Sequence, residues 1–455
     1  MTQQAHGTST LLAAYALQDH AFPALARTRA LDAITDCVGC MLAGSREPLA
    51  GKVARIAAMA VPNGARSLML GTAADAAPAD AALYNGAIAN VLDYDDSSYP
   101  AYAHTSAVLV PALLAVAASG EACGADIVTA YIVGVEVFGK LGRALNTAHY
   151  QQGWHATSTF GTLAAAVAAG RLLRLTQAQL VMALGIAASS AGGLRANFGT
   201  EMKPLHAGFA ARNGVLAALL ARAGFEASAD ALDHRFGYVQ TFNHREGIDP
   251  APLAAWGEPL EILSANGIGL KAYPSCGATH TAIEAALALR DQIGDAPIAQ
   301  VRVGVSEFAF SPLAYAVPQT PLQGKFSMHF CVAAALVDGV IKLSSFSQDK
   351  IADPRIQALM PKVRMEVDDR VRHDPAFASV VEITTASGKS YEQLVPVALG
   401  KPARWFTRQQ SRDKFFDCGA AVFAPERLER IFALLQSFDR NVAAHELFAA
   451  LRCAG

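Results

Sequence analysis

The spacing of apolar residues changes once along this chain, and that change limits the folds open to it. Up to about residue 260 the apolar residues, mostly Ala, Leu and Val, recur at helical spacing in segments such as 158–173 and 204–223. Later segments alternate apolar and polar residues, as at 298–305 and 380–385. The sequence therefore predicts a mainly α protein, with a large all-helical domain and a smaller α+β domain.

The same patterns predict where the domains begin and end. We place the helical domain at residues 1–266 and the α+β domain at 267–399. In the second domain a helix is expected at 354–359, between strands. The segment 400–455 returns to a helical pattern, with Pro425 in the first turn of a helix. We expect this segment to pack on the helical domain, which makes the α+β domain an insertion.

Composition and charge exclude several classes of function. The net charge of −2 gives no electrostatic basis for a nucleic-acid or membrane partner. Uncharged apolar runs such as 107–119 fall short of the roughly 20 residues that span a bilayer. Residues 1–9 show no signal peptide, and the seven scattered cysteines argue against a disulfide framework, so a cytoplasmic protein is expected. The motifs of phosphate loops, zinc proteases and serine hydrolases are also missing.

An acidic loop with a histidine interrupts the uncharged background. Asp93, Asp95 and Asp96 follow an apolar helix, and a helix C-terminus disfavours anions. His104 stands just ahead of the next helix. The loop is either a capping loop in which His104 bonds an Asp, or a site in which a carboxylate tunes a histidine base. Such oxygens also suit a metal ion, but we favour the histidine base, which needs no metal.

Titratable residues stand immediately before the starts of four expected helices: His104, His155, Lys203 with His206 close behind it, and Lys271. A helix start attracts anions, and a cation there adds to the attraction. A lysine at such a start needs an anion to offset it. If the starts converge, they form a pocket for a substrate with two or three carboxylates. The alternative at each position is a solvated lysine or a hydrogen-bonded core histidine.

Four motifs, in order along the chain, resemble those of the MmgE/PrpD family. They are 92–96 with 103–106 (LDYDD and AHTS), 154–163 (WHATSTFGTL), 202–208 (MKPLHAG) and 271–280 (KAYPSCGATH). The resemblance extends from about residue 10 to residue 430. The family includes 2-methylcitrate dehydratase, cis-aconitate decarboxylase and iminodisuccinate epimerase.

This resemblance implies a helical domain, a lid domain, a homodimer and an active site between the domains. It also implies that no metal or other cofactor is needed. By position, the catalytic residues are Asp93, His104, His155, Lys203 and Lys271. We expect the substrate to be bound by Ser97, His206, Tyr273, Ser275 and Cys276.

Two departures from the decarboxylase branch bear on the reaction. Cys276 stands where that branch carries a histidine, and Phe330 where it carries a tyrosine. We therefore expect a hydro-lyase similar to 2-methylcitrate dehydratase, acting on a small di- or tricarboxylic acid. The alternatives are an epimerase of an iminodisuccinate-type acid, a cis-aconitate-type decarboxylase, and a polycarboxylate-binding protein without catalysis.

All these reactions move a proton at a carbon next to a carboxylate. Such a carbon is weakly acidic, so the site must supply a base and stabilise the developing enediolate-like charge. Either His155 or His104 is expected to be the base, with Asp93 orienting the imidazole. Lys203 and Lys271 are expected to hold carboxylates and stabilise that charge.

Overall fold

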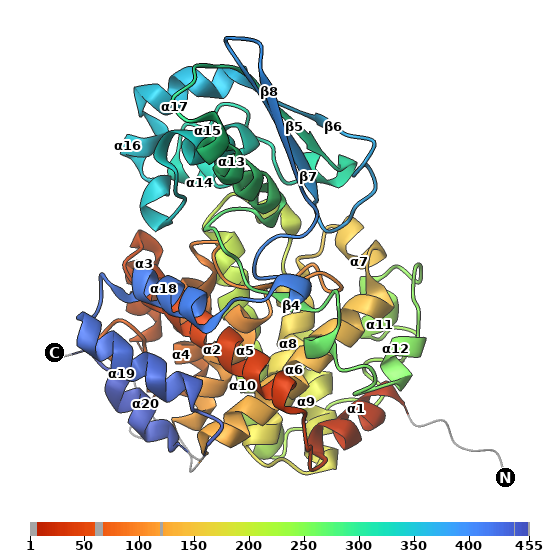
Figure 1. The fold of residues 1–455 in the computed structure, drawn as a ribbon. Helices are drawn as coiled ribbons and strands as arrows, with labels where there is room; N and C mark the ends of the chain where they lie inside the picture. The colour runs from red at the N-terminus through yellow and green to blue at the C-terminus, as the bar shows by residue number, and fades with distance from the viewer. Residues whose placement is uncertain (1–6, 60–66, 119–121, 441, 454–455) are drawn as a thin grey trace. The chain divides into compact units, whose positions relative to one another are not determined.

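The computed structural model describes residues 7–59, 67–118, 122–440 and 442–453 (Figure 1). The chain separates into two compact units. The first unit comprises Met1–Gly269 together with Thr407–Gly455, and the second unit is Leu270–Phe406. Helices predominate and the sheets are small, which confirms the predicted mainly α fold class.

The first unit is a packed set of helices. Before residue 269 they are α1 (Thr8–Leu17), α2 (Ala24–Gly44), α3 (Pro48–Ala57), α4 (Pro78–Asn90), α5 (Ser106–Ala117), α6 (Gly124–Leu145), α7 (Ala148–Gln151), α8 (Ala156–Leu172), α9 (Gln177–Ser190), α10 (Met202–Arg222), α11 (Tyr238–Phe242) and α12 (Ala251–Ala254). None of the helices in the described ranges is long and apolar enough to cross a membrane. Helix α8 is buried from Ala156 to Gly170 and contacts α5, α6, α9 and α10.

Small residues allow the central helices to approach closely. Helix α10 packs on α4 and on α8. A Cβ atom added to Gly208 would lie 2.3 Å from the Leu83 carbonyl oxygen, and one added to Gly86 would lie 2.8 Å from the Gly208 Cα atom. The α4–α10 contact therefore depends on glycine at both positions, because any larger side chain would separate the helices.

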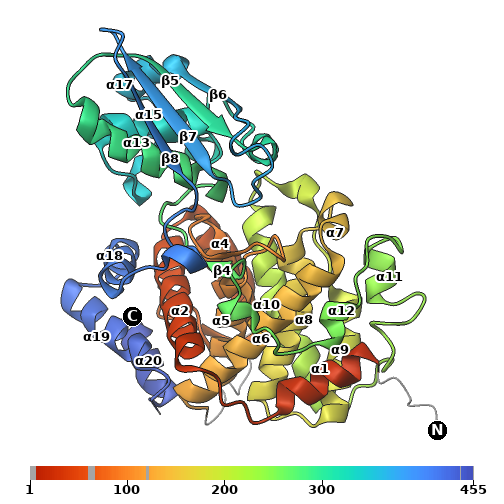
Figure 2. The ribbon, with the colours of Figure 1, turned by 45° about the vertical axis from the view of Figure 1, so that its right-hand side comes forward.

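The C-terminal segment belongs to the first unit. It forms α18 (Arg408–Gly419), α19 (Pro425–Gln436) and α20 (Ala444–Leu451), and α19 begins at Pro425 as expected. Both α18 and α19 pack against α2, and Figure 2 shows them beside it. Residues near the C-terminus thus contact residues near the N-terminus.

Very short strand pairs in the first unit were not expected from the sequence. They are β1 (Ser67–Leu68) with β2 (Asp75–Ala76), and β3 (Ser97–Ser98) with β4 (Ile268–Gly269), both antiparallel. A strand of two residues is too short to show alternation, so the sequence pattern could not reveal it. The β3–β4 pair fixes the far end of the acidic loop by pairing Ser97 with Gly269.

The second unit contains a four-stranded sheet in the order β6-β5-β7-β8. Strand β5 (Ile298–Val305) is parallel to β6 (Val363–Val367) and antiparallel to β7 (Ser379–Thr385), which pairs with β8 (Ser390–Val395). The helices are α13 (His280–Ile293), α14 (Pro321–Gly324), α15 (Met328–Asp338), α16 (Gln348–Ile351) and α17 (Pro354–Leu359). The expected helix at 354–359 is therefore confirmed.

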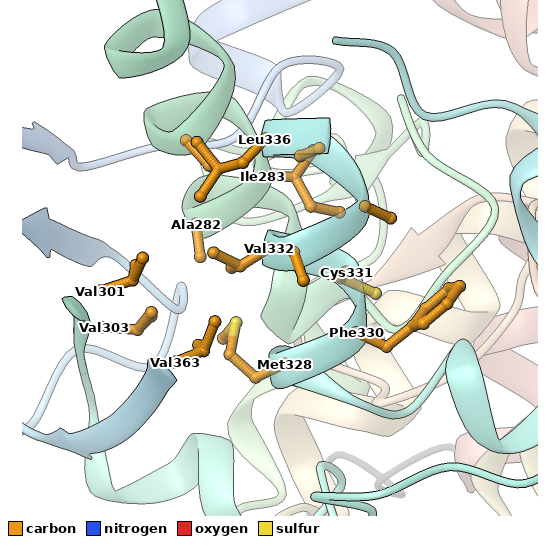
Figure 3. Packing of buried hydrophobic residues seen from close by; sticks show 14 of the residues in the cluster. Ala282, Ile283, Val301, Val303, Met328, Phe330, Cys331, Val332, Leu336 and Val363 are labelled. Atoms are coloured by element: carbon orange, nitrogen blue, oxygen red, sulfur yellow. The ribbon is translucent and has the colours of Figure 1, made fainter. Parts of the chain in front are cut away.

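Helices α13 and α15 cover the sheet and form the core of this unit (Figure 3). Val301, Val303 and Val363 project from the strands toward Ala282 on α13 and Val332 on α15. The alternating pattern that predicted the strands thus places apolar side chains against these helices.

Candidate active site

The starts of α5, α8 and α10 meet in the first unit. The backbone N–H of His104, just ahead of α5, donates to Thr157 Oγ1 in the first turn of α8 at 3.0 Å. His155, which precedes α8, places its Nδ1 atom 3.0 Å from Nδ1 of His206, the fifth residue of α10. Three of the four expected helix starts therefore converge.

Asp93 and Lys203 form the ion pair at this point. Lys203 Nζ lies 2.6 Å from Asp93 Oδ1, and both side chains are mostly buried. Asp93 has a φ of +54°, and its N–H donates to the Asn90 carbonyl oxygen at 3.1 Å. A left-handed conformation costs a residue other than glycine about 1 kcal/mol. Despite this conformational cost, the backbone directs the Asp93 carboxylate at Lys203.

The position of Lys203 differs from the one expected. Helix α10 begins at Met202, so Lys203 lies inside its first turn instead of before it. Proline at position 204 is compatible with this start, because the first turn needs no N–H donor there. The unfavourable lysine charge at the helix start is offset by Asp93 of the same chain.

The environment of His104 fixes the tautomer of its imidazole. Its Nδ1 atom lies 3.1 Å from Asp95 Oδ2 and 3.1 Å from the Asp96 carbonyl oxygen. Both are acceptors, so Nδ1 carries a proton. The amide of Asn90 donates to both oxygens of Asp95 at 3.1 and 3.0 Å, which holds that carboxylate in place.

Asp95 therefore orients His104, where the sequence had pointed to Asp93. The Asp93 carboxylate lies 3.7 Å from His104 Nε2, which is beyond hydrogen-bond distance. The second nitrogen of His104 thus faces the Asp93–Lys203 pair. Asp95 belongs to the acidic stretch that the sequence singled out, but no spacing rule distinguishes it from its neighbours.

The Asp96 side chain accepts hydrogen bonds at the start of α5. Its carboxylate accepts from the Ser106 backbone N–H at 2.9 Å and contacts Ser106 Oγ at 2.5 Å. Ser106 Oγ also contacts the Tyr131 hydroxyl at 2.6 Å. Burial raises the pKa of Asp96 to about 7, although the Ser106 hydrogen bonds oppose the rise. The group that accepts hydrogen bonds at this helix start is therefore a carboxyl group of the protein itself.

His155 and His206 form a buried imidazole pair. Burial lowers the pKa of both rings, and Lys203 lowers both further. Both are therefore neutral at neutral pH. In their Nδ1–Nδ1 contact one ring donates and the other accepts, so one Nε2 carries a lone pair and the other an N–H. The pair presents an acid and a base side by side.

Gly193 lies against His155 and the first turn of α8. The Gly193 carbonyl oxygen accepts from the His155 N–H at 3.0 Å. Gly193 has a φ of +131°, and an added Cβ would lie 2.8 Å from the Ser158 Cβ atom. Both the backbone conformation and the close approach require glycine. The sequence analysis did not single out this residue.

The remaining expected site residues lie on other segments of the chain. Ser97 is in β3 of the first unit. Lys271, Tyr273, Ser275 and Cys276 belong to the second unit, where Lys271 and Ser275 are buried.

Local contacts hold this second group. Ser275 Oγ lies 2.9 Å from Thr279 Oγ1, and the Cys276 N–H donates to the Lys325 carbonyl oxygen at 2.9 Å. Tyr273 packs edge-on against His280, with 5.3 Å between the ring centroids. Burial raises the pKa of Tyr273. The group is thus built by the segment that leads into α13.

The carboxylates of the acidic loop are already used by protein donors. Asp93 bonds Lys203, Asp95 bonds Asn90, and Asp96 bonds Ser106. Across the described residues no three His, Cys, Asp or Glu side chains are arranged to hold a metal ion. His104, held by the Asp95 carboxylate, and the neutral His155–His206 pair are groups suited to proton transfer.

Comparison with known proteins identifies the class to which this fold and site belong. The sequence pattern of the MmgE/PrpD N-terminal domain matches residues 11–251, and that of the MmgE/PrpD C-terminal domain matches residues 273–440. The chain therefore belongs to the MmgE/PrpD family, as its motifs indicated.

Curated relatives extend over most of the chain. A cis-aconitate decarboxylase of Aspergillus terreus is 29% identical over 454 residues, covering 93% of this chain and 91% of that protein. The cis-aconitate decarboxylase of Homo sapiens is 26% identical over 384 residues, covering 80% of this chain and 77% of that protein. The enzyme of the same name from Mus musculus is 26% identical over 379 residues.

Proposed function

We propose that this protein is a lyase that acts on a small di- or tricarboxylic acid by moving a proton at a carbon next to a carboxylate. The observation that carries this proposal is the fixed imidazole of His104. Its Nδ1 proton is held by Asp95, and its Nε2 faces the Asp93–Lys203 pair. A histidine held in one tautomer by a buried carboxylate is well suited to general acid–base catalysis.

Each residue then has a chemical role. His104 Nε2 takes or gives the proton, and Asp95 stabilises the imidazolium that forms. Lys203 stabilises the negative charge that develops on the substrate when its ammonium is shared between Asp93 and a substrate carboxylate. The neutral His155–His206 pair supplies a second group for proton transfer. Lys271 is proposed to bind a further carboxylate.

Decarboxylation is the first reaction to test, because the relatives that cover most of the chain are named cis-aconitate decarboxylases. In such a reaction the bond between carbon and a carboxylate breaks and carbon dioxide leaves. The electron pair stays on carbon, where it is conjugated with the alkene and a second carboxylate. A protonated imidazole then delivers the proton to carbon.

Dehydration is the second candidate, and two observations favour it. Phe330, which replaces a tyrosine of the decarboxylase branch, is buried in the apolar core of the second unit and has no hydroxyl to donate. Dehydration also needs a base for the C–H proton and an acid for the leaving hydroxyl, and the His155–His206 pair presents both. Epimerisation would use the same two groups.

The test is proton NMR of the purified, chelator-treated protein with cis-aconitate, 2-methylcitrate, citrate and an iminodisuccinate-type acid. Loss of a carboxylate would identify a decarboxylase, and loss of a hydroxyl with a new alkene would identify a hydro-lyase. Inversion without elimination would identify an epimerase and exclude a lyase. If the acids bind saturably in calorimetry but none is converted, the protein is a binding protein and the proposal is wrong. Lys203→Ala is the control for activity from contaminants.

A further inference from the structure

We propose that Lys414, on α18 in the C-terminal segment, is a positioning residue for the acidic loop. Its ion pair with Asp36 holds the Tyr94 carbonyl, and with it the flanking Asp93 and Asp95. This inference rests on the proposed function of those two carboxylates.

The contacts of Lys414 are short and shielded from solvent. Its Nζ atom lies 2.6 Å from Asp36 Oδ1 on α2 and donates to the Tyr94 carbonyl oxygen at 2.8 Å. It also lies 3.9 Å from the centroid of the Tyr94 ring. Lys414, Asp36 and Tyr94 are all buried. One ammonium thus joins α18, α2 and the loop.

The carbonyl that Lys414 holds lies between the two functional carboxylates. Asp93 precedes Tyr94 with a left-handed φ of +54°, and Asp95 follows it and holds His104 Nδ1 at 3.1 Å. Rotation of the Tyr94 peptide would therefore change the direction of both carboxylates. The bond from Lys414 opposes that rotation, because the ammonium is itself fixed by Asp36.

Charge favours the same arrangement. Burial raises the pKa of Asp36 to about 6 even though Lys414 opposes the rise, so Asp36 is ionised at neutral pH. Burial lowers the pKa of Lys414, but Asp36, together with Cys40 and Cys418, outweighs burial, and the net shift is upward. A buried ion pair is a weak source of net stability because both charges lose their hydration. Positioning of the Tyr94 carbonyl gives the Lys414–Asp36 ion pair a role that its small contribution to stability does not explain.

A second buried lysine in the same unit provides a matched control. Lys140, on α6, lies 3.6 Å from Glu136 Oε1 and donates to the Glu258 carbonyl oxygen at 3.1 Å. It resembles Lys414 in burial, in its carboxylate partner and in its bond to a backbone carbonyl. Its contacts do not include the acidic loop. Both Lys→Met substitutions remove a buried charge, but only one affects the Tyr94 peptide.

The experiment compares Lys414→Met with Lys140→Met by two readouts. One is the kcat and KM for the acid that the wild type converts. The other is the ¹⁵N NMR signal of the His104 ring, assigned with His104→Asn. Lys414→Met should lower kcat by roughly 10- to 100-fold, raise KM less, and shift the His104 signal. Lys140→Met should lower the Tm but leave kcat and the His104 signal unchanged.

Two outcomes would overturn the inference. One is equal loss of kcat in the two variants, and the other is an unshifted His104 signal in Lys414→Met. If the wild type converts no acid, the proposed function fails, but the ring signal still decides whether Lys414 positions the loop. If Lys414→Met does not fold, Lys414→Arg retains the charge and the donors. Its His104 signal should then stay closer to that of the wild type than the signal of Asp36→Ala.

Discussion

His104 and His155 differ in what their ring nitrogens contact, and this difference supports the roles proposed for them. Two oxygen acceptors hold the Nδ1 proton of His104. Burial lowers the pKa of His155, and the surrounding cations and rings of Lys203, His104, His206 and Arg195 lower it further. The Nδ1 atom of His104 thus faces a carboxylate, whereas the ring of His155 stays neutral.

The role of Asp95 can be tested by Asp95→Asn. The side-chain amide can turn its N–H toward His104 Nδ1, which would then become an acceptor and move the ring proton to Nε2. We expect kcat/KM to fall by roughly 10²-fold or more, because the base would be lost. Steady-state kinetics and the ¹⁵N signal of the His104 ring measure the two effects. Asp295→Asn, at an exposed loop position, should change neither. Full activity in Asp95→Asn would contradict the assignment.

Lys203 and His155 provide a second test at the same scale. Lys203→Ala removes the cation beside Asp93, and His155→Ala removes one ring of the buried pair. Each should lower kcat/KM by about 10²- to 10⁴-fold, the range for loss of an acid–base or charge-stabilising group. If both variants remain within about threefold of the wild type, this cluster is not the active site.

The candidate site residues could be predicted from the sequence, but the residues that contact them could not. Charge in an apolar background pointed to Asp93, His104, His155 and Lys203, and the structure brings all four together. Among the contacts of the loop, Asn90 is only five residues from Asp95, whereas Lys414 is distant from Tyr94 in the sequence. Only tertiary packing brings Lys414 to the loop, so local patterns could not reveal it.

At the scale of elements, the start of α5 makes stability depend on pH. The pKa of Asp96 is about 7 in the folded protein, against 3.8 for an unperturbed Asp. Because the pKa of Asp96 is higher in the folded protein, its contribution to the free energy of unfolding is complete below about pH 4. That contribution is lost as the pH rises through 7.

Asp96→Asn should remove this contribution. The free energy of unfolding of the wild type should fall more between pH 5 and pH 8 than that of the variant, by up to a few kcal/mol. Urea unfolding at the two pH values measures the difference. Equal changes in the two proteins would show that Asp96 keeps an ordinary pKa in the fold.

The segment between α9 and α10 gives another test. Gly193→Ala introduces a Cβ at a φ of +131° and 2.8 Å from Ser158 Cβ, beside the carbonyl that bonds His155. Gly224→Ala introduces a Cβ at a φ of +90° into open space at the other end of α10. Both should lose roughly 1 kcal/mol or more of stability from backbone strain. Only Gly193→Ala should also lower kcat. Equal kcat values in the two variants would contradict a role for Gly193 in positioning His155.

The spacing of apolar residues predicted which segments are helices and which are strands. It did not predict the exact residues at which they begin and end. The strand at 298–305 and the helix at 354–359 lie where expected. Helix α10 begins before Lys203, and the two-residue strands were not expected. A helix start depends on which backbone N–H groups find partners. At α10 the Met202 N–H donates to Thr200 Oγ1 at 3.2 Å, a contact that apolar spacing does not show.

At the scale of the whole molecule, family membership follows from the two domain patterns that match residues 11–251 and 273–440. We propose that the protein is a homodimer, as its motifs imply. Light scattering coupled to size-exclusion chromatography should give twice the mass of 47.6 kDa. A monomer at micromolar concentration would contradict that proposal.

The most direct test of the account follows solvent deuterium during turnover in D₂O. The wild type should place deuterium on the carbon next to a carboxylate, in the product or in recovered substrate, because an imidazole in exchange with solvent delivers the proton. His104→Asn should lower that incorporation by roughly 10²-fold or more. Turnover without deuterium at this carbon, or unchanged incorporation in His104→Asn, would contradict proton transfer by His104.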